Sequence, residues 1–371
     1  MDKTKLVVER LLQESGIRID GPDPWDIQVH DDRFYARALR GKNLGLGESY
    51  MDHWWDCPRL DEFFFRILSA NILAKVSHRF RLALSVLPAL LVNQQSRVRS
   101  SVVARKHYNL DNRLFMSFLD PYNQYSCGYF KNTDDLHRAQ ANKLELICRK
   151  IELKASDHVL DIGSGWGGFA RYAAEHYGCK VTGVNISGEQ IGFAQDFCKD
   201  LPVEICHCDY RDIRGTFDKI VSIGMFEHVG SKNYRTFMEK AHESLKPGGV
   251  FLLHTIGNNE THAQCDAWIR KYIFPNGMLP SLKQITKAIE GLFLVEDLHN
   301  LGPHYDKTLM AWYRNFQEAW TQLAARFDER FKRMWEYYLL SCAGAFRARY
   351  IQVWQIVLTQ YGTPQPNSRS S

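Results

Sequence analysis

A glycine-rich loop between a short apolar run and an amphipathic run constrains the fold of this chain more than any other feature. The apolar run at 158–162 predicts a buried strand, and residues 161–168 read Asp-Ile-Gly-Ser-Gly-Trp-Gly-Gly. The pattern from 167 to about 176 predicts a helix. Glycines spaced in this way let the backbone approach a ligand at the N-terminus of a helix. We therefore predict a ligand-binding strand–loop–helix unit.

Strands and helices continue to alternate after this loop. Ser187-Gly-Glu-Gln190 has the pattern of a capping box that opens another helix. Further strands are expected at 180–184, 203–208, 217–223, 250–255, 293–298 and 352–358, and further helices at 136–151, 233–245, 281–290, 308–326 and 329–349. This order is typical of a doubly wound α/β sheet.

The length of 371 residues indicates two domains. Residues 1–95 are expected to form a smaller, mostly helical domain, with a helix at its start and a loop-rich middle from Gly41 to Pro58. The α/β domain is expected at 107–362, after a basic linker at 96–106 and before a frayed tail at 363–371.

The positive charge of the chain is concentrated in one segment. Residues 63–110 contain eight basic and no acidic side chains, whereas the whole chain has a net charge of only +5. An apolar run at 82–92 lies inside this segment, and as a helix it would reach about 16 Å, short of the ~30 Å hydrocarbon layer. The segment fits contact with an anionic membrane surface, contact with nucleic acid, or a solvated helical face.

The nine cysteines indicate neither disulfides nor a zinc site, because they are odd in number and include no C-x-x-C pair. Cys206-His-Cys208 lies in an expected buried strand, so packing is the preferred interpretation and we assign no metal. The N-terminal helix pattern lacks the apolar core of an export peptide. We therefore expect a cytoplasmic protein.

Two residues argue against a dinucleotide at the glycine-rich loop. Asp161 precedes the glycines, where its carboxylate would repel a pyrophosphate, and Asn185 stands where a ribose-binding acid is expected. Asp161 is suited to donors on a cationic ligand instead. The order of elements resembles the class I S-adenosylmethionine-dependent methyltransferases. This resemblance implies a seven-stranded sheet of order 3-2-1-4-5-7-6, with strand 7 antiparallel.

Longer motifs resemble the bacterial cyclopropane fatty acid synthases. They lie at 45–55, 125–130, 159–168, 224–230, 253–257, 272–277, 305–313 and 342–347, so the likeness runs from about residue 35 to 360. The resemblance implies transfer of a methylene group from S-adenosylmethionine to the cis double bond of an unsaturated acyl chain in a membrane phospholipid. It also implies a homodimer, at the inner membrane surface, and no nucleic-acid partner.

The expected reaction passes through a carbocation, which aromatic faces stabilise by ~2 kcal/mol or more each when desolvated. About half of the aromatic residues in the motifs are expected to be core. The resemblance implies that a bound bicarbonate removes the proton, and its ligands match Cys127, Glu227, His254, Ile256 and Tyr305. Glu227 or His254 acting as the base itself is the alternative. Cys342 is a further catalytic candidate, although an inert buried thiol is the simpler interpretation.

The family's contacts to S-adenosylmethionine map onto four stretches of this sequence. Asn185 and Gln190 are neutral amides suited to ribose hydroxyls. An Asp209–Arg211 surface pair is the simpler interpretation of the last stretch. The matching positions are Tyr125, Ser126, Val159, Leu160, Asp161, Ile162, Gly163, Ser164, Gly165, Trp166, Gly167, Asn185, Ile186, Ser187, Gln190, Tyr210 and Arg211.

Three other functions remain open from the sequence. A related lipid methyltransferase would give a methyl-branched or methylenated chain from the same cation. A lipid-binding protein without activity is disfavoured because the loop, Glu227 and His254 are all present. An RNA methyltransferase would explain the basic segment but not the aromatic residues.

Overall fold

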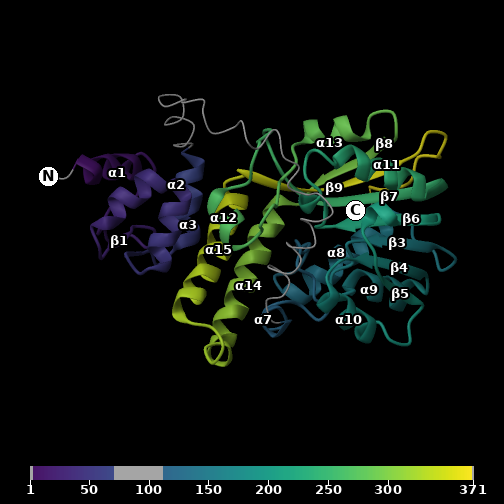
Figure 1. Cartoon of the computed structure of the whole chain (residues 1–371), viewed down its shortest axis with the longest axis horizontal. Coiled ribbons are helices and arrows are strands. Elements are labelled where there is room, and N and C mark those ends of the chain that lie inside the picture. The colour runs from purple at the N-terminus through teal and green to yellow at the C-terminus, as the bar shows by residue number, and fades with distance from the viewer. Residues whose placement is uncertain (1–2, 71–111, 370–371) are drawn as a thin grey trace. The chain divides into compact units, whose positions relative to one another are not determined.

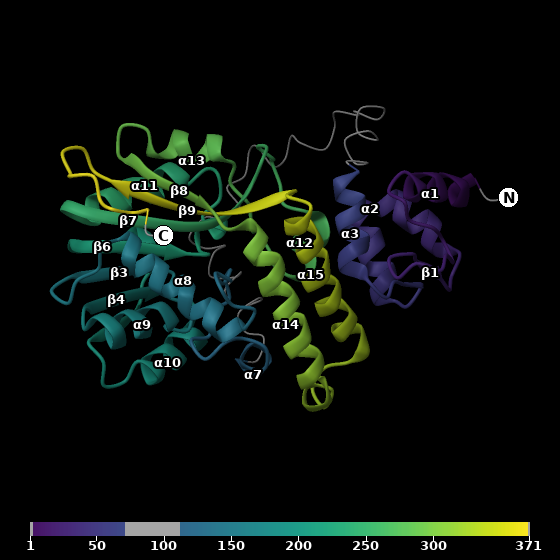
Figure 2. The same ribbon diagram turned by 180° about the vertical axis from the view of Figure 1, so that it is seen from behind.

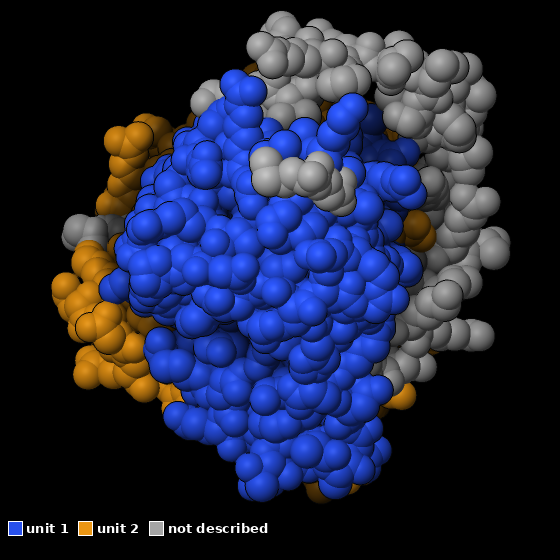
Figure 3. All heavy atoms as spheres, turned by 90° about the vertical axis from the view of Figure 1, so that its left-hand side faces the viewer, with its two compact units in different colours: residues 1–92, 263–275, 305–351 blue, residues 93–262, 276–304, 352–371 orange. Residues whose placement is uncertain are grey.

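The computed structural model describes residues 3–70 and 112–369. Most of the basic segment, the apolar run at 82–92, the boundary at 95 and the linker at 96–106 therefore lie outside the described residues. The described chain forms two compact units, coloured separately in Figure 3. Unit 1 takes in residues 3–70, 263–275 and 305–351, and unit 2 takes in residues 112–262, 276–304 and 352–369.

Unit 1 is mostly helical and draws its helices from three separate parts of the chain. Helices α3 and α15 come so close that a Cβ added to Gly344 would lie 2.6 Å from the carbonyl oxygen of Asp61. The N-terminal helices therefore share a unit with residues from beyond position 300. The elements are α1 (Lys3–Gln13), β1 (Gln28–Val29), α2 (Arg33–Met51), β2 (Trp55–Asp56), α3 (Leu60–Ser69), α12 (Ala267–Tyr272), most of α14 (Gly302–Leu323) and α15 (Glu329–Arg347).

The expected loop-rich middle of the N-terminal segment is wrong over much of its length, because α2 runs to Met51. Two of its glycines, Gly45 and Gly47, provide close packing rather than a loop. A Cβ on Gly47 would lie 2.4 Å from the indole nitrogen of Trp268, and one on Gly45 would lie 2.1 Å from the carbonyl oxygen of Arg37. The helix is kinked at Lys42, whose φ of 51° is left-handed.

Unit 2 contains a seven-stranded sheet with the order β5-β4-β3-β6-β7-β9-β8 (Figure 1). Strands β3 to β7 are paired in parallel, and β9 is antiparallel to β8. This is the strand order that the methyltransferase resemblance implied, so the expected fold is confirmed. The strands are β3 (His158–Ile162), β4 (Lys180–Asn185), β5 (Val203–His207), β6 (Phe217–Ile223), β7 (Leu245–Asn258), β8 (Leu294–Asn300) and β9 (Ile351–Thr359).

Helices cover both faces of this sheet, as Figures 1 and 2 show from opposite sides. Alternate residues of a strand point to opposite faces. Val159 accordingly packs with residues of α8, α9 and α10, whereas Leu160 and Ile162 pack with α11 and α13. The helices are α7 (Asn112–Met116), α8 (Leu136–Lys150), α9 (Gly168–Tyr177), α10 (Gly188–Phe197), α11 (Tyr234–Ser244) and α13 (Leu282–Ile289), with short 3-10 turns η1 (Tyr210–Asp212) and η2 (Phe226–His228).

Helix caps in unit 2 follow the sequence signals in part. The carboxylate of Asp135 caps α8 by accepting the backbone N–H of Arg138 at 2.8 Å. The expected capping box at Ser187 is wrong, because its side chain makes no capping hydrogen bond to α10. The side chain of Asn185 accepts the N–H of Ser187 instead, at 3.2 Å.

The C-terminal tail is packed, contrary to the expected fraying. Residues 363–369 form no helix or strand, but Ser368 is buried and the N–H of Asn367 donates to Glu152 Oε1 at 2.9 Å. Across the two described stretches, 3–70 and 112–369, no helix is both long and apolar enough to span a membrane.

Candidate active site

The glycine-rich loop links β3 to α9 at the carboxyl edge of the sheet. The N–H groups of Gly163 and Ser164 donate to the carbonyl of Val184 on β4, at 2.9 and 3.2 Å. Gly163, Gly165 and Gly167 all have positive φ, which only glycine adopts without strain. A Cβ added to Gly165 would meet nothing within 4 Å, so this side of the loop is open to a ligand. A cofactor therefore has room against the loop.

Two amide side chains close the neighbouring end of β4. Asn185 donates through Nδ2 to the carbonyl of Gly165 at 3.2 Å and to Oε1 of Gln190 at 3.0 Å. Its Oδ1 accepts the N–H of Ile186 at 2.7 Å. The hydroxyls of Ser164 and Ser187 are buried and have no hydrogen-bond partner among the described residues. These hydroxyls are available to a polar ligand such as a nucleoside.

The third predicted cofactor stretch follows β5 at η1. Arg211 pairs with Asp209, with Nε 2.7 Å from Oδ1 and Nη2 2.8 Å from Oδ2. Tyr210 is buried, and its ring lies 5.2 Å from that of Phe237. Asp209 and Arg211 form the expected ion pair, but their side chains are only 18% and 17% exposed, so the expected surface position is wrong. The pair fixes the backbone beside Tyr210.

A buried lysine supports the segment that carries Tyr125 and Ser126. Lys143 on α8 is fully buried, and its ammonium donates to the side-chain oxygen of Gln124 and, at 3.1 Å, to Ser126 Oγ. Gln140, one helical turn earlier, donates through Nε2 to the carbonyl of Ser126 at 2.8 Å. The helix therefore fixes this segment by polar contacts.

The same lysine balances the buried carboxylate of Asp161 at the start of the loop. Burial raises the pKa of Asp161 to about 7, and the nearby charge of Lys143 acts in the opposite direction. Burial lowers the pKa of Lys143 to about 8, against the charges of Asp120 and Asp161. The charge of Lys143 also acts electrostatically on Cys127 and His254. One ammonium thus connects the cofactor loop with the predicted bicarbonate ligands.

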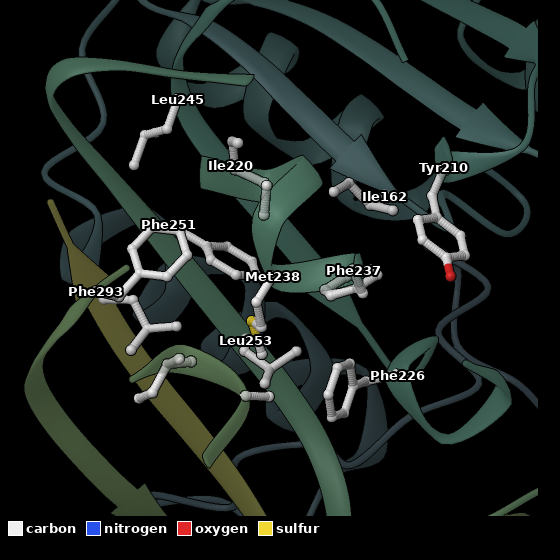
Figure 4. Close-up of a cluster of buried hydrophobic side chains, with 14 of the residues drawn as sticks. Ile162, Tyr210, Ile220, Phe226, Phe237, Met238, Leu245, Phe251, Leu253 and Phe293 are labelled. Atoms are coloured by element: carbon white, nitrogen blue, oxygen red, sulfur yellow. The ribbon is translucent and has the colours of Figure 1, made fainter. Parts of the chain in front are cut away.

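Glu227 lies in η2, immediately after β6. Its Oε1 accepts the N–H of Ile256 from β7 at 2.6 Å, whereas its buried Oε2 has no hydrogen-bond partner within residues 3–70 and 112–369. Burial raises the pKa of Glu227 to about 7. The preceding Phe226 stacks on Tyr234 with ring centroids 4.4 Å apart and belongs to the cluster in Figure 4. The core therefore holds Glu227 in place.

His254 lies in β7, beside the end of β6. Its carbonyl accepts the N–H of Gly224 at 2.9 Å. Its Nδ1 is 3.4 Å from Nε2 of Gln355 on β9, and its buried Nε2 has no hydrogen-bond partner in the described chain. Burial lowers the pKa of His254 to about 3, and the charges of Lys143 and Lys150 act in the same direction. The imidazole is therefore neutral near pH 7.

Cys127 is also part of unit 2. Its thiol is fully buried and lies 3.7 Å from the carbonyl oxygen of Leu301, as donor to acceptor. Nearby, the N–H of Phe130 donates to Nδ1 of His304 at 3.1 Å. Four of the five predicted bicarbonate ligands, Cys127, Glu227, His254 and Ile256, are thus in unit 2.

Tyr305 and Cys342 belong to unit 1, whereas the other candidate residues are in unit 2. The ring of Tyr305 stacks on Phe346, with centroids 4.6 Å apart. Burial raises the pKa of the Cys342 thiol to about 12, so it is protonated near neutral pH and a poor nucleophile. Trp312 is fully buried, and Tyr272 donates its hydroxyl to Glu48 at 2.9 Å. Some of the motif aromatics are therefore structural, as expected.

Sequence reasoning missed Lys143 and Gln355. A signal for Lys143 exists, because Gln140 and Lys143 interrupt the apolar stripe of α8 that includes Leu144 and Ile147. A polar residue on a buried helix face needs a partner. Gln355 gives no comparable signal, because scattered polar residues in an apolar strand mark neither a face nor a motif.

The strand order and the glycine loop define a class I S-adenosylmethionine-dependent methyltransferase. The sequence matches the mycolic acid cyclopropane synthetase family over residues 95–356, and the chain belongs to that family. It is 51% identical over 354 residues to the cyclopropane-fatty-acyl-phospholipid synthase of Escherichia coli strain K12, covering 95% of this chain and 93% of that protein.

Two further relatives are informative. The tuberculostearic acid methyltransferase of Mycobacterium tuberculosis is 32% identical over 382 residues, covering 96% of this chain and 88% of that protein. A solved mycolic acid cyclopropane synthase complexed with SAH and CTAB is 33% identical with a TM-score of 0.65, covering 70% of this chain and 97% of that one.

Proposed function

We propose that this enzyme transfers a methylene group from S-adenosylmethionine to the cis double bond of an unsaturated phospholipid acyl chain, forming a cyclopropane ring. The observation that carries this proposal is the 51% identity to the synthase from Escherichia coli over nearly the whole of both chains. In the net reaction the acyl chain gains one CH₂, and S-adenosylhomocysteine and a proton are released.

The residues at the glycine loop fit the methyl donor. S-adenosylmethionine supplies an electrophilic methyl group when bound. The open side of Gly165 leaves room for it, and the carboxylate of Asp161 suits a ligand that carries donors and positive charge. The amides of Asn185 and Gln190 and the buried Ser187 hydroxyl provide neutral partners for ribose and adenine.

We also propose a bicarbonate site at Glu227 and His254. Bicarbonate supplies a basic oxygen when bound, together with one hydroxyl donor. Two buried polar atoms without a partner in the described chain, Glu227 Oε2 and His254 Nε2, support this site, because buried polar atoms are normally paired. The carboxylate accepts a hydroxyl proton, and the imidazole donates from Nε2 when its proton is there. Lys143 adds positive charge nearby.

The proposed substrate, an acyl chain of a membrane phospholipid, implies that the enzyme acts at a membrane surface. An acyl chain reaches a protein site only by leaving the bilayer in part, and an interfacial element lowers that cost. We propose that the enzyme binds anionic lipid surfaces reversibly and works as a homodimer. Co-sedimentation with anionic and zwitterionic vesicles at two salt concentrations tests the first point, and light scattering tests the second.

The deciding experiment uses purified enzyme, methyl-labelled S-adenosylmethionine and vesicles of a cis-unsaturated phospholipid. Mass spectrometry of the acyl chains should show a gain of one CH₂, and proton NMR should show strongly shielded ring protons. Label absent from lipid would overturn the substrate class. Wild-type turnover unchanged after removal of carbonate would overturn the bicarbonate site and return the role of base to Glu227 or His254.

A methyl-branched or methylenated product is the second candidate. The similarity to the tuberculostearic acid methyltransferase over 96% of this chain favours it. The same experiment separates the two products, because label in a methyl branch or exocyclic methylene would replace the shielded ring signals.

A further inference from the structure

Gln355 is a buried amide beside the proposed bicarbonate site. It is fully buried in β9, the strand next to β7 in the sheet, and its Nε2 lies 3.4 Å from Nδ1 of His254. The other amide atom, Oε1, is buried and has no hydrogen-bond partner in the described chain. A buried amide with one unused acceptor costs free energy, so its retention needs a reason other than packing.

The contact with Gln355 favours one of the two neutral tautomers of His254. A neutral imidazole has one N–H and one lone pair, and the partner of one nitrogen fixes the role of the other. In the structure the amide NH₂ of Gln355 faces Nδ1. An NH₂ group can only donate, so this contact is a hydrogen bond in the tautomer whose ring proton is on Nε2. That nitrogen is the one without a protein partner.

The charged groups around His254 keep the ring neutral. Lys143 and Lys150, both on α8, oppose a second proton on the imidazole. Lys150 itself is paired with Asp297 on β8 at 3.0 Å. With no second proton available, the ring can donate from one nitrogen only, and the neighbour at Nδ1 selects which one.

We propose that Gln355 is a positioning residue that holds His254 in the tautomer with Nε2–H directed to an oxygen of the bound anion. This inference rests on the proposed bicarbonate site. It assigns His254 the role of hydrogen-bond donor, since Nε2 in this tautomer has no lone pair with which to remove a proton. It leaves proton removal to the anion, whose hydroxyl donates to the carboxylate of Glu227.

The test compares Gln355→Met with Gln352→Met in the full-length enzyme. Methionine matches glutamine in shape and length and removes the donor. Gln352 is a matched control on the same strand, because it is also buried and pairs through Oε1 with Asn300 at 3.0 Å. We measure the bicarbonate concentration for half-maximal rate, turnover at saturating bicarbonate, and S-adenosylmethionine affinity.

Gln355→Met should raise the half-maximal bicarbonate concentration by about tenfold, the effect of one lost hydrogen bond. Turnover at saturating bicarbonate should recover to within about threefold, because bound anion restores the tautomer. S-adenosylmethionine affinity should not change, and Gln352→Met should alter neither kinetic value. Equal bicarbonate dependence in both variants would overturn the inference.

Gln355→Glu provides a second, independent outcome. A carboxylate beside Nδ1 demands the proton there, so Nε2 becomes an acceptor and the site should lose bicarbonate activation altogether. A Gln355→Glu enzyme that keeps wild-type bicarbonate activation contradicts the inference. A wild type without bicarbonate dependence contradicts the proposed site instead, so the two failures are distinguishable.

Discussion

The Glu227 carboxylate accepts the backbone N–H of Ile256 at 2.6 Å, which joins the turn after β6 to the adjacent strand β7. One carboxylate oxygen thus serves the fold, and the other, Oε2, is buried without a partner in the described chain. This division fixes the direction of the second oxygen. It also allows the two roles to be separated by mutation.

Replacing Glu227 by Gln should preserve the fold and impair catalysis. The amide oxygen can still accept the Ile256 N–H, but the amide nitrogen cannot accept a hydroxyl from the proposed anion. We expect turnover to fall about 100-fold or more with S-adenosylmethionine affinity nearly unchanged. Single-turnover kinetics and calorimetry measure the two effects. Glu239→Gln, an exposed residue of α11 paired with Arg235, is the control, and equal turnover in both variants would refute the role of Glu227.

The contribution of Glu227 to the stability of the unliganded enzyme should fall as the pH rises from about 4.5 to 7. The pKa of Glu227 is raised from 4.5 to about 7 by burial, so within this window the folded state binds more protons than the unfolded state. The part of the free energy of unfolding that Glu227 contributes then decreases with pH and levels off above 7. Comparing wild type with Glu227→Gln removes the contribution of other groups, including Asp161.

The difference in the free energy of unfolding between these two proteins should grow by at most about 3 kcal/mol across the window, which corresponds to the change in the pKa of Glu227 from 4.5 to about 7. Urea unfolding at pH 5, 6, 7 and 8 measures it. A difference that stays constant from pH 5 to 8 would mean that Glu227 is not buried as a neutral acid.

Replacing Lys143 by Met should weaken binding of S-adenosylmethionine. The ammonium holds Gln124 and Ser126 on either side of Tyr125, and it balances Asp161 on the loop. Without it we expect about a tenfold loss of affinity, because two hydrogen bonds to a charged donor are lost. Titration calorimetry checks this, with the exposed Lys154→Met as control. Unaltered affinity in Lys143→Met would show that the segment is held by other contacts.

Replacing Cys342 by Ala should leave most of the activity. Burial raises the pKa of this thiol to about 12, so the thiolate is rare at neutral pH, and the proposed reaction needs no covalent thiol step. We expect turnover within about threefold of wild type. A loss of more than 100-fold in a folded variant that still binds S-adenosylmethionine would establish a catalytic role for Cys342.

Local patterns in the sequence predicted the sheet and its loop well. Strands β3 and β6 begin and end at the predicted residues, 158–162 and 217–223, because largely apolar runs and flanking turns mark both ends. The glycines at 163, 165 and 167 also have the positive φ that a ligand loop requires. Periodicity and turn chemistry are local, so they can be read directly from a sequence.

Contacts between distant residues could not be predicted in this way. Gly47 resembles a loop residue until Trp268 is known to pack against it, 221 positions later. Gln355 and His254 are likewise 101 positions apart, and neither suggests the other. The candidate ligands Glu227 and His254 came from a family resemblance, whereas the unpaired atoms that support them became visible only in three dimensions.

The joint packing of α3 and α15 affects the order in which this chain can mature. Residues 3–70 leave the ribosome first, but the helix that covers Phe64, α15, is made from residues 329–347. The apolar side of α3 therefore stays exposed, or is covered by a chaperone, until more than 250 further residues have been synthesised. A fragment cut near residue 95 would separate Phe64 from Tyr337, whose rings lie 5.2 Å apart. The two-unit enzyme should be expressed and engineered as one translation product, with tags at its ends rather than between the units.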